Sequence, residues 1–173
     1  MKTRRSNHGI VFWITGLPGS GKTNIAKNIL KRIEKDYGPT LHLSGDEVRK
    51  MLRVTGYTKQ ERFKIGLKYH KICRKISELG VNVLFDVVCL IEKIRKENRK
   101  YLENYLEIFI KADGKILIEK KKKYFYKIKT KNVWGIDIKP EFPKKPEIVI
   151  NNNFKKTIAQ LSNSLLKKIH NYY

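Results

Sequence analysis

Residues 16–23, Gly-Leu-Pro-Gly-Ser-Gly-Lys-Thr, constrain this chain more than any other stretch. They fit the pattern G-x-x-x-x-G-K-[ST], a phosphate-binding loop between a strand and a helix. The flanks agree, because residues 10–14 are apolar and rich in β-branched and aromatic side chains, and apolar residues recur at helical spacing from position 25. The alternative, a glycine-rich turn without a ligand, seldom carries Gly-Lys-Thr at this offset. We therefore predict a nucleotide site.

Each part of this loop has a predicted role in holding ATP and Mg²⁺. Its glycines allow several backbone N–H groups to turn inward and, with the helix N-terminus, to form a cradle for phosphate. Lys22 is expected to reach the β- and γ-phosphates, and the Thr23 hydroxyl to ligate Mg²⁺. The predicted ATP-binding residues of the loop are Gly16, Leu17, Pro18, Gly19, Ser20, Gly21, Lys22 and Thr23.

The length of 173 residues fits one domain with a sizeable core. No apolar run approaches the roughly 18 to 20 residues that a membrane span needs. The apolar stretch behind the basic residues 1–8 is too short for a signal peptide, and we expect those first residues to be disordered. Cys73 and Cys89 have no metal-ligand spacing and are expected to be free, buried or half-buried thiols. These features favour a cytoplasmic protein without a membrane partner.

The formal net charge of +23 has two interpretations. A strongly basic chain can bind nucleic acid, which gives the hypothesis of a nucleotide-gated nucleic-acid-binding protein. An excess of Lys, Ile, Asn and Tyr is also typical of an AT-rich genome, with lysine at solvated positions. Because the lysines are scattered along the chain and no RNA-binding motif accompanies them, we favour the second interpretation and expect no nucleic-acid partner. The field would still attract anionic nucleotides.

The rest of the chain alternates strands and helices. Apolar runs predict strands at 10–14, 40–43, 81–88, 106–110 and 147–150. Helical spacing predicts helices at about 22–35, 47–52, 60–79, 92–104, 113–123 and 154–169, with an exit turn at 44–46 and no clear core element at 124–145. This order predicts an α/β fold: one domain, residues 1–173, whose five-stranded parallel sheet carries helices on both faces. Such sheets bind ligands at the carboxyl ends of their strands.

The segment Leu-Ser-Gly-Asp-Glu-Val-Arg at 43–49, together with the phosphate-binding loop, resembles adenylylsulfate kinases, which carry D-G-D-N-x-R there. Further matches follow in the family's order over about residues 10–150. They are Gly56-Tyr57-Thr58 with Glu61-Arg62 for G-F-S…D-R, Arg95 and Arg99 for paired arginines, residues 123–126 for K-G-L-Y, and Gly135-Ile136-Asp137 for G-[IV]-D. The resemblance implies a P-loop kinase that transfers the γ-phosphate of ATP, with Mg²⁺, to the ribose 3′-hydroxyl of a small nucleotide.

The resemblance and the chemistry of phosphoryl transfer together suggest roles opposite the loop. Asp46 would orient the acceptor hydroxyl, act as its general base or hold Mg²⁺ through water; the alternative is a helix cap. Arg49 and Arg62 would clamp an anionic group of the acceptor, or form surface ion pairs. Tyr57 would stack on the acceptor base or pack in its loop. Asp86, where the family usually has a serine, would support Mg²⁺ or cap a helix.

The resemblance also implies a short lid that closes on ATP at about residues 120–132. Lys120 stands where the family has arginine and is expected to bind ATP. Lys123 stands where the family has lysine and is expected to bind substrate. The alternative for both is a solvated lysine face.

Departures from the family lie on the acceptor side. Ser44 and Glu47 replace the first aspartate and the asparagine of D-G-D-N, Ile65 replaces a later asparagine, and Val133, beside Trp134, replaces a phenylalanine that helps to sandwich the acceptor adenine. Losing polar groups that read a base changes which base is accepted. The acceptor is then adenylylsulfate by family default, or a cytidine diphosphate derivative, as in the cytidine diphosphoramidate kinase branch that serves capsular polysaccharide modification. No residue pattern decides between a monomer and a homodimer.

Overall fold

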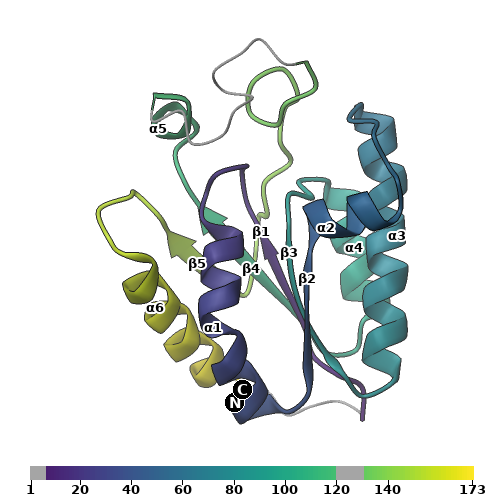
Figure 1. Ribbon diagram of the computed structural model, residues 1–173, viewed down its shortest axis with the longest axis vertical. Coiled ribbons are helices and arrows are strands. Elements are labelled where there is room, and N and C mark those ends of the chain that lie inside the picture. The colour runs from purple at the N-terminus through teal and green to yellow at the C-terminus, as the bar shows by residue number, and fades with distance from the viewer. Residues whose placement is uncertain (1–6, 120–130) are drawn as a thin grey trace.

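The computed structural model describes residues 7–119 and 131–173 (Figure 1). The expected disorder of the N-terminus therefore falls almost entirely outside the described residues. The same holds for most of the expected lid, including Lys120 and Lys123.

Five parallel strands form one sheet in the order β2-β3-β1-β4-β5. The strands are β1 (Val11–Thr15), β2 (Thr40–Ser44), β3 (Asn82–Val87), β4 (Tyr105–Lys111) and β5 (Ile148–Asn151). The predicted α/β fold with a five-stranded parallel sheet is confirmed. Because β1 lies in the middle of the order, the loop that follows it emerges at the centre of the sheet's carboxyl edge.

Helices cover both faces of the sheet (Figure 1). They are α1 (Lys22–Tyr37), α2 (Gly45–Met51), α3 (Lys59–Glu78), α4 (Glu92–Tyr101), α5 (Gly114–Glu119) and α6 (Ile158–Tyr172). Apolar residues of α1 and α6 pack with one face, and those of α3 and α4 pack with the other. Within the described ranges, no helix is both long and apolar enough to cross a membrane.

Strand β1 shows why the central strands are unbroken apolar runs in the sequence. Phe12 and Ile14 belong to the core under α1 and α6, whereas Val11 and Trp13 belong to the core under α3 and α4. All four side chains are fully buried, and the Trp13 ring meets the Phe85 ring edge-on with 5.2 Å between centroids. Burying a large apolar side chain contributes about 1.5–3 kcal/mol. Cys73 and Cys89 are also buried free thiols, as predicted.

Three predicted boundaries are wrong by several residues. Helix α2 begins at Gly45, so the expected exit turn at 44–46 is largely helix. Helix α4 ends at Tyr101, three residues early, because β4 begins at Tyr105. Helix α6 begins at Ile158 rather than 154, because the Thr157 hydroxyl accepts from the backbone N–H of Gln160 in a capping box.

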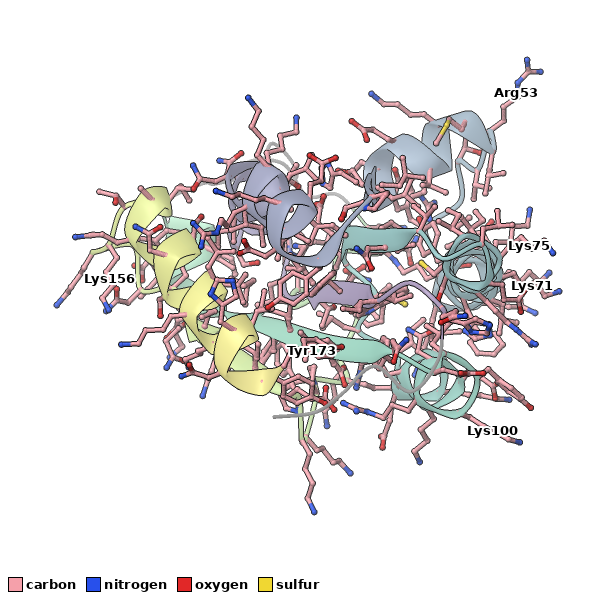
Figure 2. All side chains as sticks on the ribbon, turned by 90° about the horizontal axis from the view of Figure 1, so that it is seen from below. Arg53, Lys71, Lys75, Lys100, Lys156 and Tyr173 are labelled. Atoms are coloured by element: carbon pink, nitrogen blue, oxygen red, sulfur yellow. The ribbon has the colours of Figure 1, made fainter. Side chains whose placement is uncertain are left out.

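Basic side chains project from both helical layers rather than from one face (Figure 2). Lys71 and Lys75 extend from α3, Lys100 from α4, Arg53 from the end of α2, and Lys156 from the approach to α6. This distribution agrees with lysine filling solvated positions.

Candidate active site

The phosphate-binding loop leaves β1 and enters α1 with a backbone that needs glycine. Gly21 has φ 96°, in the left-handed region. A Cβ on Gly16 would lie 2.5 Å from the carbonyl oxygen of Ile110, so no larger residue fits there. Lys22 is buried, and its Nζ donates to the Leu17 carbonyl oxygen at 2.9 Å. The ammonium group is therefore held inside the curve of the loop.

Asn152, which the sequence reasoning missed, ties this loop to the end of β5. Its Nδ2 donates to the Ser20 carbonyl oxygen at 2.9 Å, and its backbone N–H donates to the Lys111 carbonyl oxygen at 2.8 Å. The side chain is 4 % exposed. A polar residue directly after an apolar strand run at the carboxyl edge is the signal that could have identified it.

Thr23, Asp86 and His42 form a chain of hydrogen bonds beside the loop. The Thr23 hydroxyl donates to Asp86 Oδ1, and His42 Nε2 lies 2.8 Å from Asp86 Oδ2. Asp86 is 3 % exposed and belongs to β3. It caps no helix, since the N-cap of α4 is Ile91. His42 escaped the sequence reasoning, because only the pairing of β2 with β3 brings it to Asp86.

This arrangement fits Mg²⁺. A hydroxyl and a carboxylate offer the oxygen ligands that Mg²⁺ prefers, and Mg²⁺ in phosphate sites usually takes only one or two protein carboxylates, with phosphate and water supplying the rest. In residues 7–119 and 131–173, no group of three or more His, Cys, Asp or Glu side chains offers a complete protein cage. Thr23 and Asp86 could therefore supply two oxygen ligands to such a metal.

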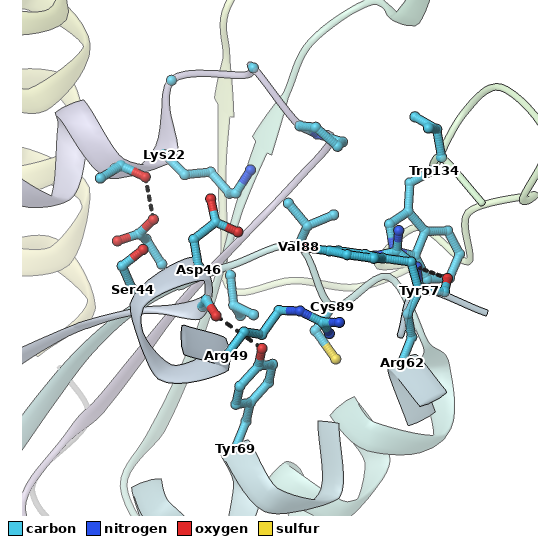
Figure 3. Close-up of a pocket in the computed structure, with 18 of the residues that line it drawn as sticks. Lys22, Ser44, Asp46, Arg49, Tyr57, Arg62, Tyr69, Val88, Cys89 and Trp134 are labelled. Atoms are coloured by element: carbon cyan, nitrogen blue, oxygen red, sulfur yellow. Dashed lines mark hydrogen bonds between the residues drawn. The ribbon is translucent and has the colours of Figure 1, made fainter. Parts of the chain in front are cut away.

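A cleft of about 1570 Å³ extends from the loop across the carboxyl edge to residues 131–134. Asp46, exposed on the first turn of α2, and Lys22 point toward one another across it (Figure 3). Arg49, one turn later on α2, points to the far part of the cleft, near Tyr69. One short helix therefore offers a carboxylate to the middle of the cleft, facing Lys22, and a guanidinium to the acceptor end.

Arg49 is buried against the loop that follows α2. Its guanidinium carbon lies 4.2 Å from the centre of the Tyr57 ring, and its Nη2 donates to the Gly56 carbonyl oxygen. In the described part of the chain, its Nε is buried without a hydrogen-bond partner. Tyr69 below it donates its hydroxyl to the Gly45 carbonyl oxygen at 3.1 Å, and burial raises the pKa of that hydroxyl. Tyr69 is therefore neutral and adds no negative charge beside Arg49.

Arg62, on α3, joins the two loops that border the acceptor end. Its Nε donates to the Tyr57 carbonyl oxygen at 2.7 Å, and its Nη2 donates to the Asn132 carbonyl oxygen at 2.6 Å. Burial and the neighbouring Arg49 charge lower the pKa of its guanidinium to about 10, so Arg62 stays cationic at neutral pH. Its hydrogen bonds go to neutral carbonyl groups, and the Asp137 carboxylate acts on it through space rather than in an ion pair.

The four arginines that match positions of the family fall into two environments. Arg95 and Arg99, which match the family's paired arginines, lie outside the cleft and form ion pairs with Glu107, where burial dominates and raises the pKa of the Glu107 carboxyl. Arg49 and Arg62 line the cleft and, among the described residues, form no ion pair. The surface-ion-pair alternative therefore does not describe them.

The wall at the acceptor end is apolar and aromatic. Ile65, Val133 and Trp134 line it and are each at most 6 % exposed, whereas Tyr57 is 49 % exposed. The Asp137 carboxylate accepts from the backbone N–H groups of Asn132 and Val133 and so shapes the loop that carries this wall. The structure thus brings together every predicted acceptor residue that it describes.

Comparison with known proteins gives a consistent family. Residues 8–151 match the family model described as adenylylsulphate kinase. A cytidine diphosphoramidate kinase of Campylobacter jejuni is 33% identical over 167 residues, which cover 94% of this chain and 98% of that protein. A probable adenylyl-sulfate kinase of Aeropyrum pernix is 32% identical, with 93% of this chain and 94% of that protein covered.

Solved structures agree on the fold. The Mycobacterium tuberculosis APS kinase in complex with AMPPNP and APS superposes with a TM-score of 0.81, covering 94% of this chain and 98% of that one. At 20% sequence identity this likeness shows the fold alone.

Proposed function

This chain belongs to the adenylylsulfate kinase family and is a phosphotransferase with a hydroxyl acceptor, and we propose that it transfers the γ-phosphate of ATP, with Mg²⁺, to the ribose 3′-hydroxyl of a small nucleotide that carries a distal anionic group. One observation carries the proposal. One cleft has the phosphate-binding loop at one end and, at the other, two guanidinium groups that form no ion pair with any described carboxylate. Asp46 lies between them (Figure 3).

At the donor end, the backbone N–H groups of residues 16–23 and the start of α1 would hold the ATP phosphates, and Lys22 would turn from the Leu17 carbonyl to the γ-phosphate. Thr23 and Asp86 would hold Mg²⁺. When bound, Mg²⁺ neutralises charge that spreads over the phosphate oxygens during transfer. Lys120 and Lys123 remain part of the proposal as lid residues.

At the acceptor end, Arg49 and Arg62 would exchange carbonyl contacts for the distal anion of the acceptor. This positions the 3′-hydroxyl near Asp46, which takes its proton. The hydroxyl oxygen then forms a bond to the γ-phosphorus as the bond to the β–γ bridging oxygen breaks, and ADP leaves with the electron pair of that bond. Positioning and charge stabilisation thus supply most of the catalysis.

For the base, we propose cytosine over adenine. Ile65 offers no hydrogen bond to a base, and the buried indole of Trp134 occupies the wall where the family's phenylalanine is replaced by Val133. The 33% identity of this chain to a cytidine diphosphoramidate kinase supports this choice. With cytosine as the base, we also propose the role in capsular polysaccharide modification that is expected for that branch. Adenylylsulfate is the second candidate acceptor.

The test is product analysis. The enzyme is incubated with Mg²⁺·ATP and either cytidine 5′-diphosphoramidate or adenylylsulfate, ADP release is followed, and the phosphate is located by ³¹P and ¹H NMR. We expect acceptor-dependent ADP release and a 3′-phosphorylated product, with no product from a 3′-deoxy acceptor. Phosphate at another position, or ADP release that ignores the acceptor, would contradict the proposal.

Expectations about localisation, nucleic-acid binding and oligomeric state belong to the same proposal. A kinase that consumes ATP and carries free buried thiols suits the cytoplasm. We propose no nucleic-acid partner, and anisotropy with labelled RNA and DNA over a salt series would reveal one as tight, steeply salt-dependent binding. The homodimer also remains a proposal, which light scattering tests.

A further inference from the structure

We propose that His42 is a positioning residue for Mg²⁺·ATP, because its imidazole holds the Asp86 carboxylate with one oxygen turned toward Thr23. This inference rests on the proposed use of Mg²⁺·ATP. His42 would touch neither nucleotide nor metal; it would act through Asp86.

The sheet register places the two side chains on one face. Ser44 pairs with Asp86 and His42 pairs with Leu84 in the β2–β3 ladder. Leu84 belongs to the core under α1 and α6, so His42 and Asp86, at alternating positions, face α1 as well. Thr23 lies at the start of α1. The three polar side chains therefore meet between the sheet and the first turn of that helix.

Both oxygens of the Asp86 carboxylate have partners. Oδ1 accepts from the Thr23 hydroxyl, and Oδ2 lies 2.8 Å from His42 Nε2. The side chains of His42 and Asp86 are 12% and 3% exposed, so little water can replace either partner. An ionised carboxylate only accepts, which assigns the proton to Nε2 of the imidazole. A second hydrogen bond at Oδ2 fixes the rotation of the carboxylate and thus the direction of Oδ1.

The register also accounts for why a histidine is needed at this place. The family's D-G-D-N segment has an acid at the position of Ser44, whereas this chain has its acid at Asp86, directly across the ladder. Neighbouring strands lie about 4.8 Å apart, so the carboxylate stays in the same row but comes from β3. A carboxylate from β3 has β2 as its neighbour, and His42 is the β2 residue that reaches it.

The test measures how far Mg²⁺ tightens binding of the ATP analogue AMPPNP, by calorimetry in Mg²⁺ and in EDTA. We expect His42→Leu to weaken the Mg²⁺-dependent part by about 10- to 100-fold and to leave binding in EDTA unchanged. His42→Gln, whose amide N–H can still donate, should retain most of the Mg²⁺ effect. His70→Leu is the matched control, because His70 is buried and bonded to Asn98, outside the cleft.

A folded His42→Leu variant with the wild-type Mg²⁺ effect would overturn the proposal, and so would His42→Gln with the same loss as His42→Leu. If His42→Leu does not fold, ¹⁵N NMR of the wild-type imidazoles decides. Adding Mg²⁺ to the AMPPNP complex should shift the His42 signals and leave those of His70 in place; unshifted His42 signals would overturn it. Failure of the proposed function shows separately, as wild-type enzyme that phosphorylates no nucleotide acceptor.

Discussion

At the scale of single residues, the cleft keeps three cations close to neutral carbonyl oxygens. Lys22 donates to Leu17, Arg49 to Gly56, and Arg62 to Asn132. A phosphate or carboxylate adds charge–charge attraction to such a hydrogen bond, which a neutral carbonyl oxygen does not. Phosphate and acceptor anions would therefore displace these carbonyl contacts.

The donor end gives the first prediction. We expect Lys22→Ala to lower kcat by at least about 100-fold with any acceptor, because the variant lacks the charge that we propose meets the γ-phosphate in the transition state. Lys27→Ala, an exposed residue one turn along the same helix, is the control and should keep wild-type kcat. ADP release measures both, and near-wild-type turnover by Lys22→Ala would remove the loop from the mechanism.

Asp46 carries the second prediction. Asp46→Asn should lower kcat by about 10²- to 10⁴-fold, the usual contribution of a general base. ATP affinity should change less than about two-fold, because the proposed role of Asp46 is to take the proton of the acceptor hydroxyl rather than to bind ATP. Glu47→Gln, the adjacent exposed carboxylate of α2, controls for charge. An unchanged kcat in Asp46→Asn would assign the proton to another group.

Sequence reasoning named several residues that line the cleft, but it missed residues whose contacts are with other site residues. Asp46, Arg49 and Arg62 were predicted because short motifs fix their types and spacing, and the cleft contains all three. His42 and Asn152 were missed because their partners, Asp86 and Ser20, are 44 and 132 positions away in the chain. Only strand register and loop packing create those contacts.

At the scale of elements, strand periodicity predicted the sheet well and local capping explains the errors. Strands such as β3 can be recognised in the sequence as continuous apolar runs, because both of their faces are buried. Helix α2 starts earlier than predicted because Gly45 and Asp46 read as turn residues, yet the extended Ser44 lets helical backbone begin directly after β2. The turn preference of Gly45 and Asp46 is therefore outweighed, because α2 follows β2 with no intervening loop.

The third prediction concerns the strand that carries the acidic side chain. The family has an acid on β2, at the position of Ser44, whereas this chain has it on β3, at Asp86. Asp86→Ser should lower Mg²⁺-dependent kcat/KM by roughly 10- to 100-fold. Adding Ser44→Asp should recover at least about ten-fold of that loss, because the two positions are register neighbours. Steady-state kinetics over a Mg²⁺ series measures both variants. If the double variant has no higher kcat/KM than Asp86→Ser, a carboxylate at position 44 on β2 cannot replace the one on β3.

The junction of β5 with the phosphate-binding loop gives the fourth prediction. Asn152→Ala should lower the free energy of unfolding by about 1–3 kcal/mol, since the buried Ser20 carbonyl loses its donor. Asn153→Ala, which alters an exposed neighbour, should change it by less than about 0.5 kcal/mol. Urea denaturation measures both. Equal effects of the two variants would mean that Asn152 does not anchor the loop.

At the scale of the whole molecule, charge and cleft act together. The net charge of +23 is spread over both helical layers (Figure 2), so it would attract anions in general. Within this field the cleft concentrates Lys22, Arg49 and Arg62 at the ends of one cavity. A small, multiply charged nucleotide pair is the ligand that such an arrangement suits.

The most direct test of this account is the ratio of kcat/KM for cytidine 5′-diphosphoramidate to that for adenylylsulfate, measured with wild-type enzyme at saturating Mg²⁺·ATP. The fifth prediction is a ratio of at least about ten, because Ile65 lacks the hydrogen-bonding amide that the family's asparagine offers to the acceptor at this position. A ratio below one would contradict the assignment of the acceptor base. Absence of turnover with either nucleotide would contradict the kinase reaction proposed for this cleft.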